Sequence, residues 1–97
     1  MIKYQTRPGV VLTEIAGEYA LIAAKKLLDE CPYITQISES SAFLWQQMTD
    51  GASLEELENA VCEEYQVEEP EDVRPAIIDF LQQLTDLNYL LQEDIHA

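Results

Sequence analysis

The first third of the chain alternates short apolar runs with turn residues, which predicts β-strands. Residues Val10–Ile15 are mostly β-branched and apolar, as strands prefer. A break that contains Gly17 separates them from a second run, Tyr19–Ala24. We therefore expect a β-hairpin. The Ala, Leu and Lys content of Ala20–Glu30 also favours a helix. The sequence therefore does not decide whether the second strand continues or the chain becomes helical before Pro32.

A third strand is expected over Tyr33–Ser38, directly after Pro32, which fits the first position of a strand. Residues 31–38 carry no charge, although the edges of sheets are usually protected by charged side chains. An unprotected edge can accept an extended peptide as an additional strand. Alternatively, Lys25–Glu30 or a second copy of the chain covers this edge.

The rest of the chain shows helical periodicity. A first helix is expected to begin after a cap at Ser38 or Ser40 and to end at the Asp-Gly pair of residues 50–51. Ser53 and Glu56 form a capping box that opens a second helix.

A third helix is expected to be capped by Asp72, with Pro75 in its first turn, where a missing N–H does no harm. Asn88 is expected to end it in the left-handed conformation. The apolar residues that recur at helical spacing are Val73, Ala76, Ile77, Phe80, Leu81, Leu84 and Leu87.

This order of elements predicts an α+β fold, a winged helix-turn-helix with three N-terminal antiparallel β-strands followed by three α-helices. The 97 residues contain no repeat or linker, so a single domain over residues 1–97 is expected. No apolar run is long enough to cross a bilayer, and residues 1–5 lack the apolar core of a signal peptide. We therefore expect a cytoplasmic protein in which Cys31 and Cys62 are reduced.

The charge of the chain narrows the choice of partners. Nineteen acidic residues against five basic ones give a formal net charge of −14. Such a surface repels the phosphates of nucleic acid and anionic lipid. We therefore expect neither nucleic acid nor a membrane as partner, even if the acidity serves solubility alone.

The sequence contains no arrangement of residues that is typical of catalysis or of a metal site. The single histidine, His96, is the penultimate residue. Cys62 lies among carboxylates, which disfavour a reactive thiolate, and Cys31 has no histidine nearby. The carboxylates expected on the solvated face of the second helix are Glu55, Glu56, Glu58, Glu63 and Glu64. We expect no enzyme activity, no cofactor and no metal.

Several segments resemble the PqqD family in their order and spacing. They are Arg7-Pro8-Gly9-Val10-Val11-Leu12, Gly17-Glu18-Tyr19, Ile37–Trp45, Asp50-Gly51, Leu54–Leu57, Glu63-Glu64-Tyr65, Asp72-Val73 and Phe80–Leu84. The resemblance covers about residues 7–91. Ser38, Ser41 and Asn88 differ from the residues that are common in the family.

The resemblance implies a recognition element for ribosomally made, post-translationally modified peptides (RiPPs), which binds a leader peptide and catalyses nothing itself. In this family the leader of a precursor peptide adds to the third strand and lies against the third helix. PqqD itself presents its precursor to a radical SAM enzyme, so a modifying enzyme of that class is one expected partner. By position, the peptide-binding residues would be Tyr33, Ile34, Thr35, Gln36, Ile37 and Ser38 of the strand and Arg74, Ile77, Ile78 and Leu81 of the helix.

Two other functions suit such a fold. An adaptor or structural subunit, as a monomer or a homodimer, would dock on an enzyme without binding a peptide. A DNA-binding winged helix would need basic residues on its reading helix. Arg74 is the only basic residue between positions 50 and 97, so DNA binding is disfavoured.

Overall fold

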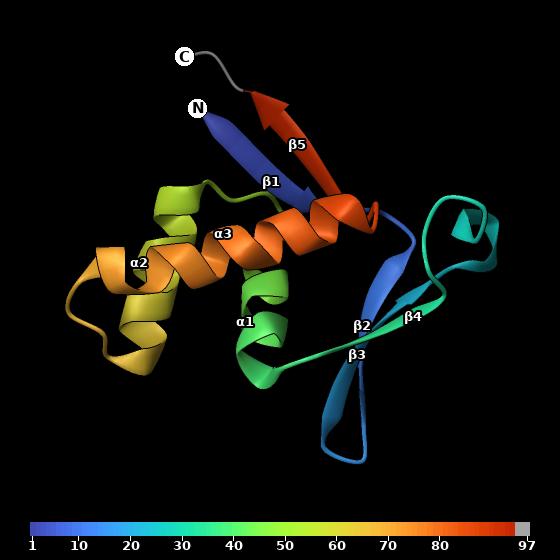
Figure 1. The fold of residues 1–97 in the computed structure, drawn as a ribbon, viewed down its shortest axis with the longest axis horizontal. Helices are drawn as coiled ribbons and strands as arrows, with labels where there is room; N and C mark the ends of the chain where they lie inside the picture. Colours follow the sequence, from blue (N-terminus) through green and yellow to red (C-terminus); the bar gives the residue numbers. More distant parts are fainter. Residues whose placement is uncertain (95–97) are drawn as a thin grey trace.

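The computed structural model describes residues 1–94, which form five strands, three α-helices and one 3₁₀ helix (Figure 1). The strands are β1 (Ile2–Thr6), β2 (Val10–Ile15), β3 (Glu18–Ala23), β4 (Ile34–Ile37) and β5 (Leu90–Asp94). The helices are α1 (Glu39–Gln47), α2 (Leu54–Tyr65) and α3 (Pro70–Asp86), and the 3₁₀ helix is η1 (Lys25–Leu27). The predicted α+β winged helix-turn-helix is confirmed, with two additional strands.

Strands β2, β3 and β4 form an antiparallel sheet in that order, so β2 and β4 are its edges. The predicted hairpin between β2 and β3 is confirmed. Its loop residues Ala16 and Gly17 have φ angles of 53° and 82°. Two positive φ values are typical of a type I′ turn, whose twist matches that of the flanking strands. After Ala23 the chain continues into η1, so the helical propensity of this region is realised only in that short segment.

Strands β1 and β5 form a second antiparallel sheet that was not predicted from the sequence. They lie side by side near the two ends of the chain (Figure 1). Tyr4 of β1 also exchanges two main-chain hydrogen bonds, of 2.8 and 2.9 Å, with Ala52. These bonds attach the small sheet to the turn that precedes α2. Both strands extend outside the segment 7–91 that carries the family resemblance.

The predicted helix caps of α1 and α2 are confirmed. The Oγ atom of Ser38 accepts a hydrogen bond of 3.2 Å from the N–H of Ser41. Ser53 and Glu56 form the capping box of α2 through two hydrogen bonds of 3.0 and 3.2 Å. Each cap satisfies amide groups that have no partner inside the helix.

The predicted cap of α3 at Asp72 was wrong, because the helix begins at Pro70 and Glu69 occupies the cap position. A proline suits the first helical position, where its fixed φ is already helical and no N–H is needed. Pro75 consequently lies inside the helix and removes one hydrogen bond of the i→i−4 type.

The end of α3 forms a Schellman motif. Asn88 has the predicted left-handed conformation, with a φ of 62°. The N–H of Tyr89 donates to the carbonyl oxygen of Leu84 at 3.0 Å, and the N–H of Asn88 donates to that of Thr85 at 3.1 Å. This motif reverses the chain direction, so Tyr89 enters the core with none of its surface exposed.

The core lies between the inner face of the three-stranded sheet and the helices. Its most deeply buried large side chains are Leu21, Met48, Leu57, Ile77, Leu84 and Tyr89. Trp45 is 4% exposed and also belongs to this core. The core thus joins β3, the three helices and the residue before β5 into one packed unit.

The expectation that every carboxylate of α2 is solvated was wrong for Glu58, which is 4% exposed. The guanidinium of Arg74 donates from Nε to Oε1 and from Nη2 to Oε2 of Glu58, both at 2.9 Å. Hydrogen bonds from Arg74 lower the pKa of Glu58 below its ordinary value. A charged, bidentate partner of this kind allows a carboxylate to be buried while ionised.

Candidate functional site

The edge strand β4 offers main-chain groups that point away from the sheet. The N–H of Ala23 donates to the carbonyl oxygen of Tyr33 at 2.8 Å. Along an antiparallel strand, successive residues direct their N–H and C=O groups to opposite sides. The main-chain N–H and C=O groups of Tyr33, Thr35 and Ile37 are therefore directed toward β3. Those of Ile34 and Gln36 are directed outward from the edge.

The segment that precedes β4 does not occupy this edge. The N–H of Ala24 donates to the carbonyl oxygen of Gly9 at 2.7 Å, which places η1 beside the start of β2. A Cβ atom on Gly9 would lie 2.9 Å from Cδ1 of Leu27, so the glycine permits this close approach. Within residues 1–94, no hydrogen bond joins the segment 25–31 to Ile34 or Gln36. Within this described part of the chain, Lys25–Glu30 therefore forms no hydrogen-bonded strand partner for these two residues, and whether it covers the edge in another way stays a prediction.

The six strand residues predicted to bind a peptide lie together, although β4 itself comprises only Ile34–Ile37. Tyr33 precedes the strand, and Ser38 is the cap of α1. The exposed side chains are Tyr33, Ile34, Gln36 and Ser38, whereas Thr35 and Ile37 are half-buried. The exposed fractions of Tyr33 and Ile34, 59% and 52%, are large for apolar residues and leave their side chains available for contacts.

An apolar recess of about 210 Å³ opens close to the end of β4, between α1, α2 and α3. Its lining residues are Ser40, Leu44, Val61, Tyr65, Asp72, Val73, Ala76 and Ile77. Ser40 follows the last residue of β4 by three positions. An extended chain that pairs with β4 could therefore direct a side chain from its end into this recess.

The structure places the predicted residues of α3 on different sides of the helix. Ile77 and Leu81 are 2% and 5% exposed and belong to the core, and Ile77 also reaches the recess. Arg74 is bound to Glu58 of α2. Ile78 lines a separate hollow together with residues of β1 and β5. Arg74 and Ile78 thus lie on the flank of α3 that faces away from the recess.

The assignment by position missed Val73 and Ala76, which α3 contributes to the recess. Val73 is half-buried and Ala76 is exposed. Both belong to the apolar stripe that the sequence predicts for this helix. The stripe identifies the face of a helix that meets the core, but not the flank that lies closer to the sheet edge.

The surroundings of the recess are acidic. Asp72 lines it, and Glu39 lies in the first turn of α1, directly after β4. Three basic residues form ion pairs, Lys3 with Glu56, Arg7 with Glu30 and Arg74 with Glu58. Their positive charges are therefore paired with carboxylates, and among the described residues Asp72 is the one charged residue that lines the recess.

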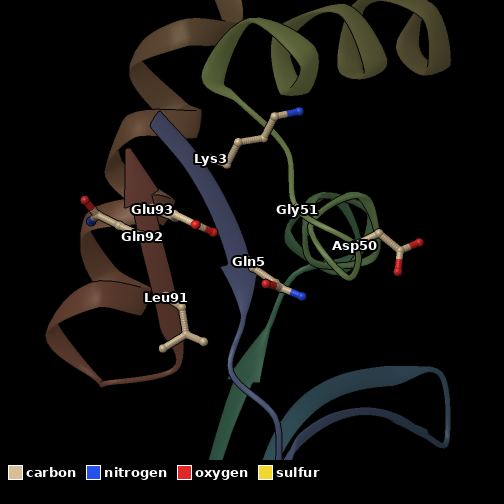
Figure 2. A pocket seen from close by; sticks show the side chains of 7 residues that line it. All are labelled: Lys3, Gln5, Asp50, Gly51, Leu91, Gln92 and Glu93. Carbon is tan, nitrogen blue, oxygen red and sulfur yellow. The ribbon is translucent and has the colours of Figure 1, made fainter. Parts of the chain in front are cut away.

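A second recess, of about 380 Å³, lies on the outer face of the small sheet (Figure 2). Lys3 and Gln5 of β1 and Leu91 of β5 line it beside the turn at Asp50 and Gly51 (Figure 2). The amine of Lys3 is engaged by Glu56 at 2.6 Å. This recess lies on β1 and β5 and takes no residue from β4.

Within residues 1–94, no cluster of three His, Cys, Asp or Glu side chains could hold a metal ion. Cys31 and Cys62 are both free thiols, and Cys31 is buried, with its Sγ donating to the carbonyl oxygen of Leu27 at 3.3 Å. His96 lies outside the described residues. Among the described helices, none is long and apolar enough to span a bilayer.

Sequence comparison identifies the family. Residues 23–90, well over half of the chain, match the family described as Coenzyme PQQ synthesis protein D (PqqD). The chain belongs to the PqqD family. The resemblance expected from the sequence is confirmed, and this family's match covers β4, all three helices and the first residue of β5. Among curated proteins, none matches this PqqD-family chain.

Two solved structures share the fold of this PqqD-family chain. The first, TbiB1 in complex with the TbiA(beta) leader peptide, has a TM-score of 0.69 and 22% identity, covering 96% of this chain and 99% of that chain. The second, lasso peptide synthetase B1 complexed with the leader peptide, has a TM-score of 0.69 and 19% identity, covering 91% of this chain and 96% of that chain. At such identities the likeness establishes the fold alone.

Proposed function

We propose that the chain is a RiPP recognition domain that binds the leader of a ribosomal precursor peptide by β-strand addition to β4. The observation that carries this proposal is the free edge of β4, where Ile34 and Gln36 direct main-chain groups outward next to an apolar recess. In strand addition, main-chain hydrogen bonds supply affinity and neighbouring pockets supply selectivity.

Two further observations support the proposal. The chain is a member of the PqqD family, and both structures that share its fold were determined with a leader peptide. We therefore assign the chain a recognition role, in which it presents the peptide to a modifying enzyme, with radical SAM enzymes as one candidate class.

The site favours a particular kind of peptide. An extended segment would pair with Ile34 and Gln36 and place an apolar side chain in the recess beside Val73 and Ala76. Basic residues of the peptide would be attracted by Asp72 and the other acidic groups nearby. A leader that is disordered when free loses conformational entropy on binding, so its affinity is modest for the area it buries.

The same properties make other partners poor candidates. The net charge of −14 opposes binding to DNA and to anionic lipid. The free thiols of Cys31 and Cys62 fit a reducing compartment such as the cytoplasm. We propose that the chain acts there as a single domain.

Titration of the isotope-labelled chain with synthetic leader peptides tests the proposal. The peptides are taken from short reading frames beside its gene, and amide NMR reports where they bind. We expect shifts at residues 33–38 and along the recess flank of α3. If no peptide causes shifts and the chain instead co-purifies with an enzyme in the absence of peptide, the adaptor function is the correct one.

A further inference from the structure

The free edge of β4 ends abruptly at Pro32. Proline has no N–H, and the carbonyl oxygen of Pro32 accepts a hydrogen bond of 2.7 Å from the hydroxyl of Tyr89. Pro32 therefore offers no donor to an added strand, and its carbonyl oxygen is held toward the buried side chain of Tyr89. The outward groups of Ile34 are the last ones that a peptide could use in this direction.

Tyr89 is held firmly in this position. Its side chain is fully buried, and its Oη atom lies 3.0 Å from Oγ1 of Thr35. Because the single phenolic proton is donated to Pro32, the hydroxyl of Thr35 must donate to Tyr89. Two consecutive hydrogen bonds, from Thr35 to Tyr89 and from Tyr89 to Pro32, thus connect β4 and the segment before it to the end of α3.

The segment before β4 is fixed by the same end of α3. The side-chain amide of Asn88 donates to the carbonyl oxygen of Glu30 at 2.7 Å. Arg7 donates to the carbonyl oxygen of Asn88 at 3.2 Å and to the carboxylate of Glu30 at 2.9 Å. Pro32 therefore cannot easily move away from Tyr89 to release its carbonyl group.

The other end of the edge is also limited. The carbonyl oxygen of Ser38 accepts from the N–H of Ala42 at 2.9 Å, in the first turn of α1. Between Pro32 and this cap, Ile34 and Gln36 are the residues whose N–H and C=O groups are both directed outward. An added strand can thus pair only with the short stretch from Ile34 to Gln36. On a longer edge, an extended peptide could slide by two residues and keep the same side-chain face.

We propose that Tyr89 is a positioning residue that stops the added strand at Ile34 and thereby sets the register of the bound peptide. This inference rests on the proposed function and adds a residue to it that does not touch the peptide itself. By holding the carbonyl oxygen of Pro32 toward its own buried hydroxyl, Tyr89 leaves a sliding peptide without an acceptor at the next outward position. The unmet groups of the peptide would disfavour that register.

The test is amide hydrogen exchange of an isotope-labelled synthetic leader peptide, as used in the titration, in complex with the full chain. With the unchanged chain, we expect the protected peptide amides to end opposite Ile34. In Tyr89→Phe the carbonyl oxygen of Pro32 loses the hydrogen bond that holds it toward the core and can turn outward. One further peptide amide should then be protected, with an exchange rate about fivefold lower, as expected of one hydrogen bond.

Thr35→Val is the matched control, because it removes the hydrogen bond to Tyr89 but keeps the one from Tyr89 to Pro32. Its set of protected peptide amides should equal that of the unchanged chain. If Tyr89→Phe showed the same set of protected peptide amides, Tyr89 would not be what stops the added strand at Ile34. The proposed function would be unaffected by that result.

The unchanged chain provides a test that does not depend on the folding of any variant. Protection of a peptide amide opposite Pro32 in that complex overturns the stop alone. If the unchanged chain protects no peptide amide at β4, the proposed function fails, and the stop fails with it. These two failures are distinguished by the protection of amides opposite Ile34 and Gln36.

Discussion

Arg74 and Glu58 form a bidentate ion pair that joins α3 to α2, with both N···O distances at 2.9 Å. The side chain of Glu58 is 5% exposed, whereas that of Arg74 is 46% exposed. The buried carboxylate therefore depends on a guanidinium group at the surface. Removing one partner of such a pair leaves an unpaired buried charge, and this costs more stability than the attraction between the partners contributes.

Replacing Arg74 should destabilise the fold. In Arg74→Gln the buried carboxylate of Glu58 loses its charged partner, and we expect the free energy of unfolding to fall by about 1–3 kcal/mol. Urea unfolding at neutral pH measures the change. The double variant Arg74→Met, Glu58→Met should recover most of the loss, because no buried charge remains. Unchanged stability with reduced peptide affinity would instead assign Arg74 to the peptide site.

The stability of the chain should depend on pH through Glu56. Its pKa is lowered from 4.5 to about 2, first by the hydrogen bond from Lys3 and then by those from Ser53. A carboxylate with a lower pKa in the folded state stabilises the fold above its unfolded pKa, and this contribution is lost as the pH falls towards the folded pKa. The stability that Glu56 provides should therefore be complete near neutral pH and disappear between about pH 4.5 and 2.

The comparison with Glu56→Gln isolates this effect from the titration of other carboxylates. Glutamine can also occupy the last position of a capping box, so the variant keeps the cap and loses the charge. We expect the difference in unfolding free energy between the two chains to shrink as the pH falls through that range. A difference that stays constant over the range would show that the ionisation of Glu56 does not stabilise the fold.

The helix caps could be predicted because each depends on residues that are close in sequence. Ser38, the box of Ser53 and Glu56, and the left-handed Asn88 each satisfy main-chain groups within one turn. The hairpin loop is local in the same sense. The prediction for α3 failed at its start because Pro70 and Asp72 are both acceptable first-turn residues, and sequence spacing alone does not choose between them.

Contacts between distant residues could not be predicted in this way. Strand β1 alternates polar and apolar residues, but its partner β5 lies almost the whole chain length away. The burial of Glu58 could not be predicted, because it depends on the packing of α3, which brings Arg74 beside it. Likewise, the periodicity of α3 defines the core stripe, whereas the flank next to β4 depends on how the helix packs on α1 and α2.

The two flanks of α3 can be compared directly with one pair of substitutions. Ala76 lines the recess and is exposed, whereas Ile78 lies on the opposite flank and is 46% exposed. Ala76→Glu should weaken leader peptide binding by about tenfold or more, because a bound apolar side chain would desolvate the carboxylate. Ile78→Glu should leave binding nearly unchanged. The opposite result would place the peptide on the flank with Arg74 and Ile78. Thermal unfolding of both variants controls for loss of the fold.

Strand addition itself can be tested by removing a single main-chain donor. The N–H of Gln36 points away from β3, so Gln36→Pro removes a group that the folded chain does not use. We expect peptide affinity to fall by about tenfold, because one main-chain hydrogen bond is lost and the proline ring obstructs the approach of a partner strand. Isothermal titration with the leader peptide measures the change.

Glu14→Pro provides the matched control at the other edge of the same sheet. The N–H of Ala24 donates to the carbonyl oxygen of Gly9, so Gly9 faces β3, and the alternation directs the N–H of Glu14 outward from β2. Both variants carry a proline in an edge strand and lose an unused donor, so their costs to folding should be similar. If Gln36→Pro and Glu14→Pro bound the peptide equally well, β4 would not be the edge that accepts it. Loss of binding in Gln36→Pro alone, with both variants folded, requires main-chain contact at β4, because the two substitutions differ in which edge they close.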